Sequence, residues 1–336
     1  MDPRDVVTLG HGSGGKMTHA LVRDVFMRRF SNPALVAMGD SAVLDAVGAK
    51  VAFTTDAFVV SPLFFTGGDI GKLAVCGTVN DLAVAGAVPL YLSAAFIVEE
   101  GLKIADLDLV AASMAEAATS AGVAIVAGDT KVVERGHGDG VFITTAGVGR
   151  MRQGAPEGPG SVRIGDAVVV SGPIGDHGAV IAAHRSGLAL EGFGSDCGAV
   201  TGVVDAMYRA GIRPRFMRDP TRGGIATALA ELAGQAGVSV AIREADLPVR
   251  DGVRTVCEIL GLDPLYLACE GRVVAVVGAD DAEAAASAMR EVDGGEGARA
   301  IGEISAPTSG PVVLRTRYGG TRLYDRLASE QLPRIC

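Results

Sequence analysis

Short apolar runs and longer segments of helical periodicity alternate along the chain, with glycine turns between them. Short runs rich in Val, Ala and Ile predict strands, and the longer segments predict helices. Two such runs flank Gly48-Ala49-Lys50, and this turn predicts an antiparallel hairpin. The strands predicted in the first half are 5–9, 41–47, 51–55, 90–98, 123–127 and 141–148, and the helices are 17–30, 69–85 and 105–121.

The second half follows a change in composition, because segment 154–160 consists mainly of Gly and Pro and predicts a linker. We therefore expect one domain over 1–153, a second over 161–306, and a segment 307–336 with strands and a mobile tail that ends in Cys336. Neither half keeps a regular βαβ alternation, so the predicted class is α+β. The strands predicted here are 167–171, 238–242, 264–269, 272–277, 300–304, 311–316 and 322–323, and helices begin near 176 and cover 198–210, 224–236, 251–260 and 280–292.

The composition narrows the class of protein. A length of 336 residues exceeds one ordinary core, which agrees with two domains. The net charge of −9 argues against a broad basic surface for nucleic acid. Neither a secretory signal nor an apolar run long enough to cross a membrane is visible. The five cysteines form no CxxC pair, so we expect no disulfide framework and no zinc site, and a reduced, cytoplasmic enzyme fits best.

The segment from Gly10 to Lys16 fits two phosphate-binding patterns at once, GxGxxG and GxxxxGK. Met17 follows where a P-loop requires Ser or Thr, and the hairpin that comes next is not the crossover of a dinucleotide fold. Both patterns are therefore weak, and a plain turn is the simplest alternative. We still expect this loop near phosphate, because its backbone N–H groups and Lys16 suit an anion.

Aspartates end or interrupt several predicted elements. Asp40 lies in Gly-Asp-Ser-Ala, Asp56 ends the predicted strand 51–55, and Asp81 lies in a helix whose surface is mostly apolar. Each has an alternative interpretation as a cap or turn residue. Together, carboxylate oxygens on strand ends and on one helix favour a magnesium cluster that holds the phosphates of a nucleotide.

Other charged groups lie beside predicted strands and helices. Lys131 follows the predicted strand 123–127 and His137 lies in the next loop, where each is either a chemical group or a solvated side chain. Segment 218–224 brings a carboxylate, two Arg and two Gly to a helix N-terminus, which suits an anion. Glu270 occupies a turn between two predicted strands and is either a turn acid or a functional group.

The chain ends in Pro-Arg-Ile-Cys, which places the thiol of Cys336 beside the terminal carboxylate. A thiol at the end of a polar tail is an arm rather than a core residue, or else part of a frayed end without function. The eight residues 329–336 span at most about 26–29 Å when extended. That reach is enough to carry a sulfur from a cleft to the surface of a partner.

These motifs together resemble the HypE family of hydrogenase maturation factors, over essentially the whole chain. The terminal Pro-Arg-Ile-Cys is specific to that family, and the other motifs are shared with the aminoimidazole ribonucleotide and selenophosphate synthetases. The resemblance implies a PurM-like ATP-binding fold of two α+β domains, with N-terminal domains that pair strands across a homodimer. The motifs are Leu-Gly-His-Gly-Ser-Gly-Gly-Lys (9–16), Gly-Asp-Ser-Ala (39–42), Thr-Thr-Asp-Ala (54–57), Gly-Asp-Ile-Gly-Lys-Leu (68–73), Val-Asn-Asp-Leu (79–82), Gly-Asp-Thr-Lys (128–131), Asp-Pro-Thr-Arg-Gly-Gly (219–224) and Pro-Arg-Ile-Cys (333–336).

The resemblance implies an ATP-dependent carbamoyl dehydratase. The carbamoyltransferase HypF is expected to load a carbamoyl group onto Cys336, and ATP to drive its dehydration to a thiocyanate. An iron-carrying HypC–HypD complex would then receive the cyano group for NiFe hydrogenase. Lys131 and Glu270 are implied as candidate bases that tune each other, with His137 a weaker third. The implied magnesium ligands are Asp40, Asp56, Asp81 and Asp219, and the implied nucleotide contacts are Gly14, Gly15, Lys16, Asp40, Asp56, Lys72, Asn80, Asp81, Asp129, Thr221 and Gly223.

Three alternatives remain open at this point. The first is another ATP-using synthetase of the same superfamily, although such enzymes need no terminal thiol and selenophosphate synthetases carry a Cys in the glycine loop. Segment 10–16 has no Cys. The second is a non-catalytic nucleotide-binding scaffold. The third is the dinucleotide enzyme that GxGxxG suggests.

Overall fold

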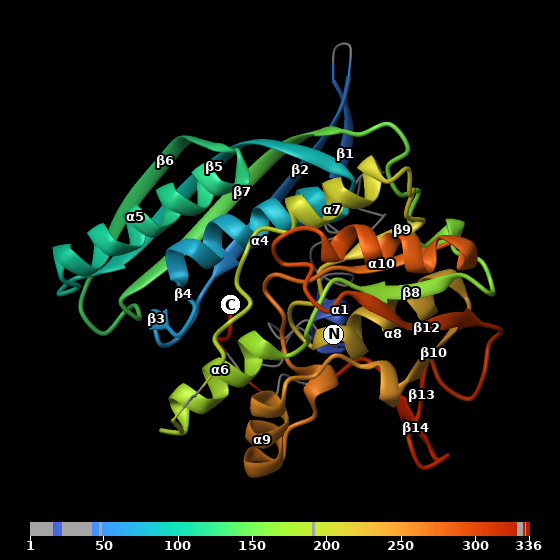
Figure 1. Ribbon diagram of the computed structural model, residues 1–336. Helices are drawn as coiled ribbons and strands as arrows, with labels where there is room; N and C mark the ends of the chain where they lie inside the picture. Colours follow the sequence, from blue (N-terminus) through green and yellow to red (C-terminus); the bar gives the residue numbers. More distant parts are fainter. Residues whose placement is uncertain (1–15, 22–41, 47–48, 190–191, 328–331, 333) are drawn as a thin grey trace.

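The computed structural model describes residues 16–21, 42–46, 49–189, 192–327, 332 and 334–336. Two mixed sheets organise these residues, and each belongs to one half of the chain (Figure 1). The first sheet has five strands in the order β1-β2-β7-β5-β6, and the second has seven in the order β14-β13-β10-β12-β8-β11-β9. The predicted α+β class with two domains is therefore the observed architecture.

The first sheet begins with the predicted hairpin, because β1 and β2 pair antiparallel in direct register. Only β5 and β6 run parallel among its described strands, and α5 connects them. Asp69 caps α4 by accepting hydrogen bonds from the N–H groups of Gly71 at 2.7 Å and Lys72 at 3.2 Å. The elements are α1 (Lys16–Leu21), β1 (Ala42–Ala46), β2 (Ala49–Phe58), β3 (Phe64–Phe65), β4 (Gly68–Asp69), α4 (Ile70–Val84), β5 (Ala87–Glu99), α5 (Ile104–Ala121), β6 (Ala124–Val133) and β7 (Val141–Met151).

Helices α4 and α5 cover one face of this sheet (Figure 1). Along β2, Thr54 and Phe58 are buried beneath the helices, whereas Phe53, which directly precedes Thr54, points to the opposite face. That opposite face is apolar yet exposed, since Phe53 is 42 % exposed and Tyr91 is 53 % exposed. Among the described residues, no second layer covers this face of the first sheet.

The second sheet forms the core of the other domain, and the strands of segment 307–336 extend it rather than stand apart. β13 pairs parallel with β10, and β14 pairs antiparallel with β13. The elements are η3 (Pro159–Ser161), β8 (Ala167–Val170), α6 (Asp176–Arg185), α7 (Thr201–Arg209), β9 (Phe216–Arg218), α8 (Gly224–Ala236), β10 (Ser239–Arg243), η4 (Glu244–Asp246), α9 (Asp251–Leu260), η5 (Pro264–Tyr266), β11 (Val274–Val277), η6 (Ala279–Asp281), α10 (Ala282–Arg290), β12 (Arg299–Ser305), β13 (Val312–Arg315) and β14 (Thr321–Tyr324).

Three sequence predictions are wrong in detail. The predicted strand 264–269 begins as the 3₁₀ helix η5, because Asp263 caps its first turn and Pro264 favours a helical start. Strand β9 was not predicted. Strand β6 continues to Val133, so segment 128–131 lies in a strand rather than a loop, because the long β5 provides a partner along its whole length. The predicted strand 5–9 and most of helix 17–30 lie outside the described residues.

The two domains meet along α4, which lies between the first sheet and α7 (Figure 1). Asn80 is buried there, and its side chain forms hydrogen bonds with the second domain. Its Oδ1 accepts from the N–H of Val200 at 2.8 Å, and its Nδ2 donates to the carbonyls of Gly198 at 3.0 Å and Glu270 at 3.3 Å. Across the described residues, no helix has the length and apolarity to cross a membrane.

Replacing Asn80 by Leu is expected to lower the free energy of unfolding by roughly 3 kcal/mol, because one buried N–H and two buried carbonyls lose this partner. Urea denaturation followed by circular dichroism measures the change. Thr119→Ala on the exposed surface of α5 is the matched control. A loss for Asn80→Leu no larger than that of the control contradicts the role of Asn80 in joining the domains.

Candidate active site

Glu270 lies at the domain boundary, in the loop that leads from η5 to β11. Its side chain is buried, and its backbone is held from both domains. The N–H of Glu270 donates to Oδ1 of Asp196 at 3.2 Å, and its carbonyl accepts from Asn80. The next residue must be glycine, because a Cβ at Gly271 would stand 1.9 Å from the backbone oxygen of Asp196. The loop therefore fixes Glu270 within narrow limits.

The surroundings of Glu270 oppose its ionisation. Burial is the largest cause that raises its pKa well above the ordinary value, and the carboxylates of Asp196, Asp219 and Asp56 add to it, while Arg222 acts in the opposite direction. Oε1 of Glu270 has no hydrogen-bond partner among the residues that the structure describes. A buried carboxyl group with a raised pKa and an oxygen that lacks a hydrogen-bond partner among the described residues is suited to acid–base chemistry.

The aspartates of the predicted metal cluster come from both domains. Asp81 on α4 accepts from the hydroxyl of Thr54 at 2.8 Å, and Asp56 on β2 accepts from the N–H of Ala57 at 2.9 Å. Asp219 is buried between β9 and α8. Asp56 and Asp219 both act on Glu270, so negative charge gathers where a cation would offset it. Within the described ranges no group of three or more suitable side chains is arranged to hold a metal ion, and Asp40 lies outside those ranges.

Lys131, which the resemblance implies as a partner of Glu270, lies on a different part of the described chain. Its side chain is 71 % exposed on strand β6 and lies 3.0 Å from Asp129, which is also exposed. His137 is exposed in the turn that follows. The reason is topological: β6 is the edge strand of the first sheet, whereas Glu270 lies in a buried loop of the second domain.

The remaining predicted nucleotide contacts come from both domains. Lys16 is exposed and lies 3.3 Å from Asp325, and Lys72 donates to the carbonyl of Gly67 at 3.1 Å. Gly223 precedes α8 in a left-handed conformation, with Thr221 beside it. The side chain of Asn80 is hydrogen-bonded to the loop of Glu270, so it supports the position of this loop. Gly14 and Gly15 lie outside the described residues.

The end of the chain is docked in the structure rather than extended into solvent. The N–H of Val59 donates to the carbonyl of Cys336 at 3.1 Å, and the N–H of Ser61 donates to the carbonyl of Arg334 at 3.2 Å. Ile335 is 3 % exposed and belongs to the apolar cluster shared by both domains, against which Cys336 packs. The thiol therefore reaches the domain boundary, where Glu270 also lies.

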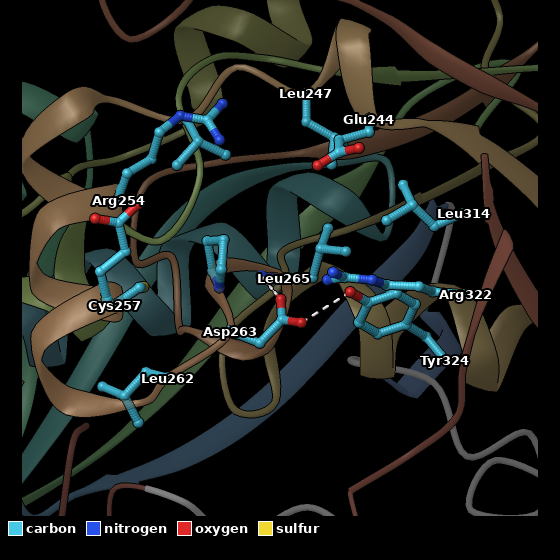
Figure 2. Close-up of a pocket in the computed structure, with 13 residues that line it drawn as sticks. Glu244, Leu247, Arg254, Cys257, Leu262, Asp263, Leu265, Leu314, Arg322 and Tyr324 are labelled. Atoms are coloured by element: carbon cyan, nitrogen blue, oxygen red, sulfur yellow. Dashed lines mark hydrogen bonds between the residues drawn. The ribbon is translucent and has the colours of Figure 1, made fainter. Parts of the chain in front are cut away.

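A separate cavity of about 210 Å³ lies in the second domain, between α9 and the strands β13 and β14. Figure 2 shows that Asp263 points toward Tyr324, and the Tyr324 hydroxyl donates to Asp263 at 2.8 Å. None of the predicted site residues lines this cavity. The domain boundary, not this cavity, gathers the candidate chemistry.

Sequence patterns alone did not single out His177, Ser195 or Asp196. His177 is fully buried in α6, and one ring nitrogen lies 2.7 Å from the carbonyl of Ile335. The only available signal was the glycine turn that opens a helix at Gly175. These residues become recognisable only once the fold places them between the tail and Glu270.

Comparison with known proteins agrees with this architecture. Residues 38–151 match the family of AIR synthase related proteins over its N-terminal domain, and residues 163–314 match the C-terminal domain of the same family. The fold and the two-domain site thus define an AIR synthase related protein.

Closer relatives narrow the class. The carbamoyl dehydratase HypE of Rhodobacter capsulatus is 52 % identical over 98 % of both chains. A crystal structure of the hydrogenase maturation protein HypE in complex with ATP is 46 % identical, with a TM-score of 0.82 and coverage of 98 % of this chain and 100 % of the other. A HypE–HypF complex structure is 46 % identical, with a TM-score of 0.85 and coverage of 92 % and 100 %. The chain belongs to the HypE family of carbamoyl dehydratases, which confirms the resemblance and the PurM-like fold.

The raised pKa of Glu270 predicts the pH dependence of stability. Between the ordinary pKa of a glutamate and the raised value, the folded state keeps a proton that the unfolded chain releases, so stability falls as pH rises through this window. Glu270→Gln removes the titrating group, and its stability is expected to fall less between pH values of about 5 and 8. Urea denaturation at several pH values, with the exposed Glu303→Gln as control, measures this. Parallel curves for Glu270→Gln and the parent would refute the assignment.

Proposed function

We propose that this chain uses ATP to dehydrate an S-carbamoyl group on its own Cys336 to a thiocyanate. The observation that carries the proposal is the docked tail, which brings Cys336 to the same domain boundary as the buried Glu270. Membership of a family of carbamoyl dehydratases supports the choice over another synthetase, a scaffold or a dinucleotide enzyme. The sulfur carries the reacting group and keeps its bond to the carbamoyl carbon throughout.

The reaction removes the carbonyl oxygen and both nitrogen protons of the carbamoyl group. The carbon–oxygen bond breaks, and a carbon–nitrogen triple bond forms on the same sulfur. ATP supplies the phosphoryl group that converts the oxygen into a phosphate leaving group. Removal of the two protons is the part that the side chains of this chain perform.

Glu270 is the proposed base for the nitrogen protons. Once ionised, its carboxylate lies in a buried site beside three other carboxylates, so it binds a proton strongly. Arg222 moderates this effect and lies next to Gly223, where it can also meet phosphate. The site therefore combines a proton acceptor with an anion-binding helix N-terminus.

ATP and magnesium are proposed to bind on the side of Glu270 that is opposite to the docked tail. Magnesium usually takes one or two carboxylates and completes its coordination with phosphate oxygens, which fits aspartates drawn from both domains. A HypE structure at 46 % identity contains ATP. The proposed ligands are Asp40, Asp56, Asp81 and Asp219 for magnesium, with Gly14, Gly15, Lys16, Lys72, Asp129, Thr221 and Gly223 toward the nucleotide.

We propose a homodimer that forms through the first sheet, because one apolar face of this sheet is exposed in the single chain. An antiparallel sheet normally buries an apolar face, yet Phe53 and Tyr91 remain exposed on the side without helices. The edge strand β6 adds Val126 and Val132, which are 62 % and 68 % exposed. Lys131 lies on the same edge strand and His137 in the loop that follows it, so we propose that their part in catalysis depends on assembly with a second chain.

HypF and the HypC–HypD complex are the proposed partners. A crystal structure of a HypE–HypF complex at 46 % identity supports HypF, which would load the carbamoyl group onto Cys336. HypC–HypD would accept the cyano group for iron. Both exchanges require the thiol to leave the cleft, and only a chain end can do this without unfolding a domain.

Glu270→Gln is expected to slow dehydration at least about 100-fold, because general-base catalysis contributes that much and the amide cannot accept the proton. The chain is loaded with HypF, carbamoyl phosphate and ATP, and intact-mass spectrometry follows Cys336. The variant should retain the carbamoyl mass without losing water, whereas Glu303→Gln should react like the parent. Dehydration at the parent rate in Glu270→Gln would sink the assignment of this base.

Val132→Glu is expected to shift the protein from dimer to monomer, because a charge on the paired edge strand must be desolvated. Sedimentation velocity measures the oligomeric state over a range of concentrations. Leu323→Glu, at another apolar position that is 54 % exposed, is the control and should leave the dimer intact. A Val132→Glu variant that sediments as the parent does argues against pairing through β6.

A further inference from the structure

The docked tail pairs along one side with residues 59–61, so the backbone groups on its other side need other partners. Residues 334 and 336 face the segment that follows β2, and in antiparallel pairing the carbonyl between them points away. That carbonyl belongs to Ile335, the residue joined directly to Cys336. Whatever holds it also fixes the start of the residue that carries the thiol.

His177 holds this carbonyl. Its Nε2 lies 2.7 Å from the oxygen of Ile335, and because a carbonyl only accepts, Nε2 must carry the hydrogen. Its Nδ1 lies 2.8 Å from Oγ of Ser195, which itself accepts from the N–H of Cys197 at 3.0 Å. The hydroxyl hydrogen of Ser195 is thus available to Nδ1. The two bonds together select one neutral tautomer, and burial lowers the pKa of His177 in agreement with a neutral ring.

The ring of His177 has little freedom to turn away. Phe65 meets it edge to face, with ring centroids 5.3 Å apart and planes at 82°. Asp196, next to Ser195, accepts from the N–H of His177 at 3.1 Å and from the N–H of Glu270 at 3.2 Å through the same Oδ1. One loop therefore positions both the ring that binds the tail and the proposed base.

We propose that His177 is a positioning residue that docks the C-terminal arm through its Nε2–H bond to Ile335, and that the loop 195–197 aligns the docked Cys336 with Glu270. Arg185, on the same helix, adds a bond to the carbonyl of Arg334 and another to that of Ser61 at 2.8 Å. Helix α6 thus holds the C-terminal arm through His177 and Arg185, and we call these two contacts the clamp. The purpose of this docking rests on the proposed function, but the docking itself is measured on a chain without a carbamoyl group.

The test is the rate at which iodoacetamide alkylates Cys336 in the full-length protein, measured on the C-terminal peptide by mass spectrometry. His177→Phe keeps the ring volume and removes both hydrogen bonds, and should raise the rate about tenfold, the usual worth of one such bond to a buried group. His177→Gln restores a donor near Nε2 and should bring the rate back to within about twofold of the parent. Cys76, Cys197, Cys257 and Cys269 are buried and report whether the fold is intact.

His184→Phe is the matched control, since His184 lies on the same helix but is exposed and contacts Thr66. It should leave Cys336 labelling unchanged. A folded His177→Phe variant that is labelled at the parent rate overturns the proposal, and so does a His177→Gln variant that behaves like His177→Phe.

Two further measurements separate docking from folding and from chemistry. If His177→Phe also exposes the buried cysteines, the Ser195→Ala variant is tested instead. It should raise the alkylation rate of Cys336 about threefold while the four buried cysteines stay protected. Alkylation of Cys336 at the parent rate in this variant overturns the proposal. In single-turnover dehydration of the preloaded chain, His177→Phe should slow the reaction in proportion to the fall in the docked fraction of the arm and leave the KM for ATP unchanged. If the parent labels as expected but never dehydrates, the clamp is supported and the proposed reaction fails.

Discussion

The buried carboxylate of Asp196 is the constraint on which the rest of the site depends. One of its oxygens accepts the backbone N–H groups of both His177 and Glu270, and its other oxygen lies 3.5 Å from Nε of Arg272. A fully buried charge is tolerated only when it is paired and hydrogen-bonded. The second domain therefore has to keep Arg272, α6 and the loop of Glu270 in one arrangement, and this arrangement also determines where the tail can dock.

The same constraint creates the chemistry. Placing Glu270 beside Asp196, Asp219 and Asp56 costs stability whenever it ionises, and no hydrogen bond to Oε1 reduces that cost among the described residues. Arg222 offsets only part of the charge. Folding free energy is thus used to hold a carboxyl group that binds protons strongly, as is common at catalytic sites.

Sequence patterns predicted most of the fold, because the hairpin of β1 and β2 and the buried helix α4 are set by local periodicity and turns. They failed where tertiary pairing decides, as in the extension of β6 by β5 and the replacement of a strand by η5. Motifs pointed to Asp56, Asp81 and Asp219, and a turn position pointed to Glu270, whereas His177 and Asp196 stand in no recognisable pattern. Their partners are backbone groups distant in sequence, and no local signal encodes such contacts. Spacing likewise does not determine whether Lys131 and Glu270 meet, since adjacency across domains is not a property of spacing.

The free energy of docking suits a tail that must both bind at the domain boundary and leave it. Each backbone hydrogen bond to Val59, Ser61 or His177 contributes about 1 kcal/mol net, and burial of the Ile335 side chain about 2 kcal/mol. Ordering the backbone of each docked residue costs about 1–2 kcal/mol, which offsets most of that gain. What remains leaves docking favourable by only a few kcal/mol, so a partner surface can compete for Cys336. Losing a single bond then raises the undocked fraction up to about tenfold, so a residue such as His177, which touches neither nucleotide nor thiol, can set how firmly the arm is docked.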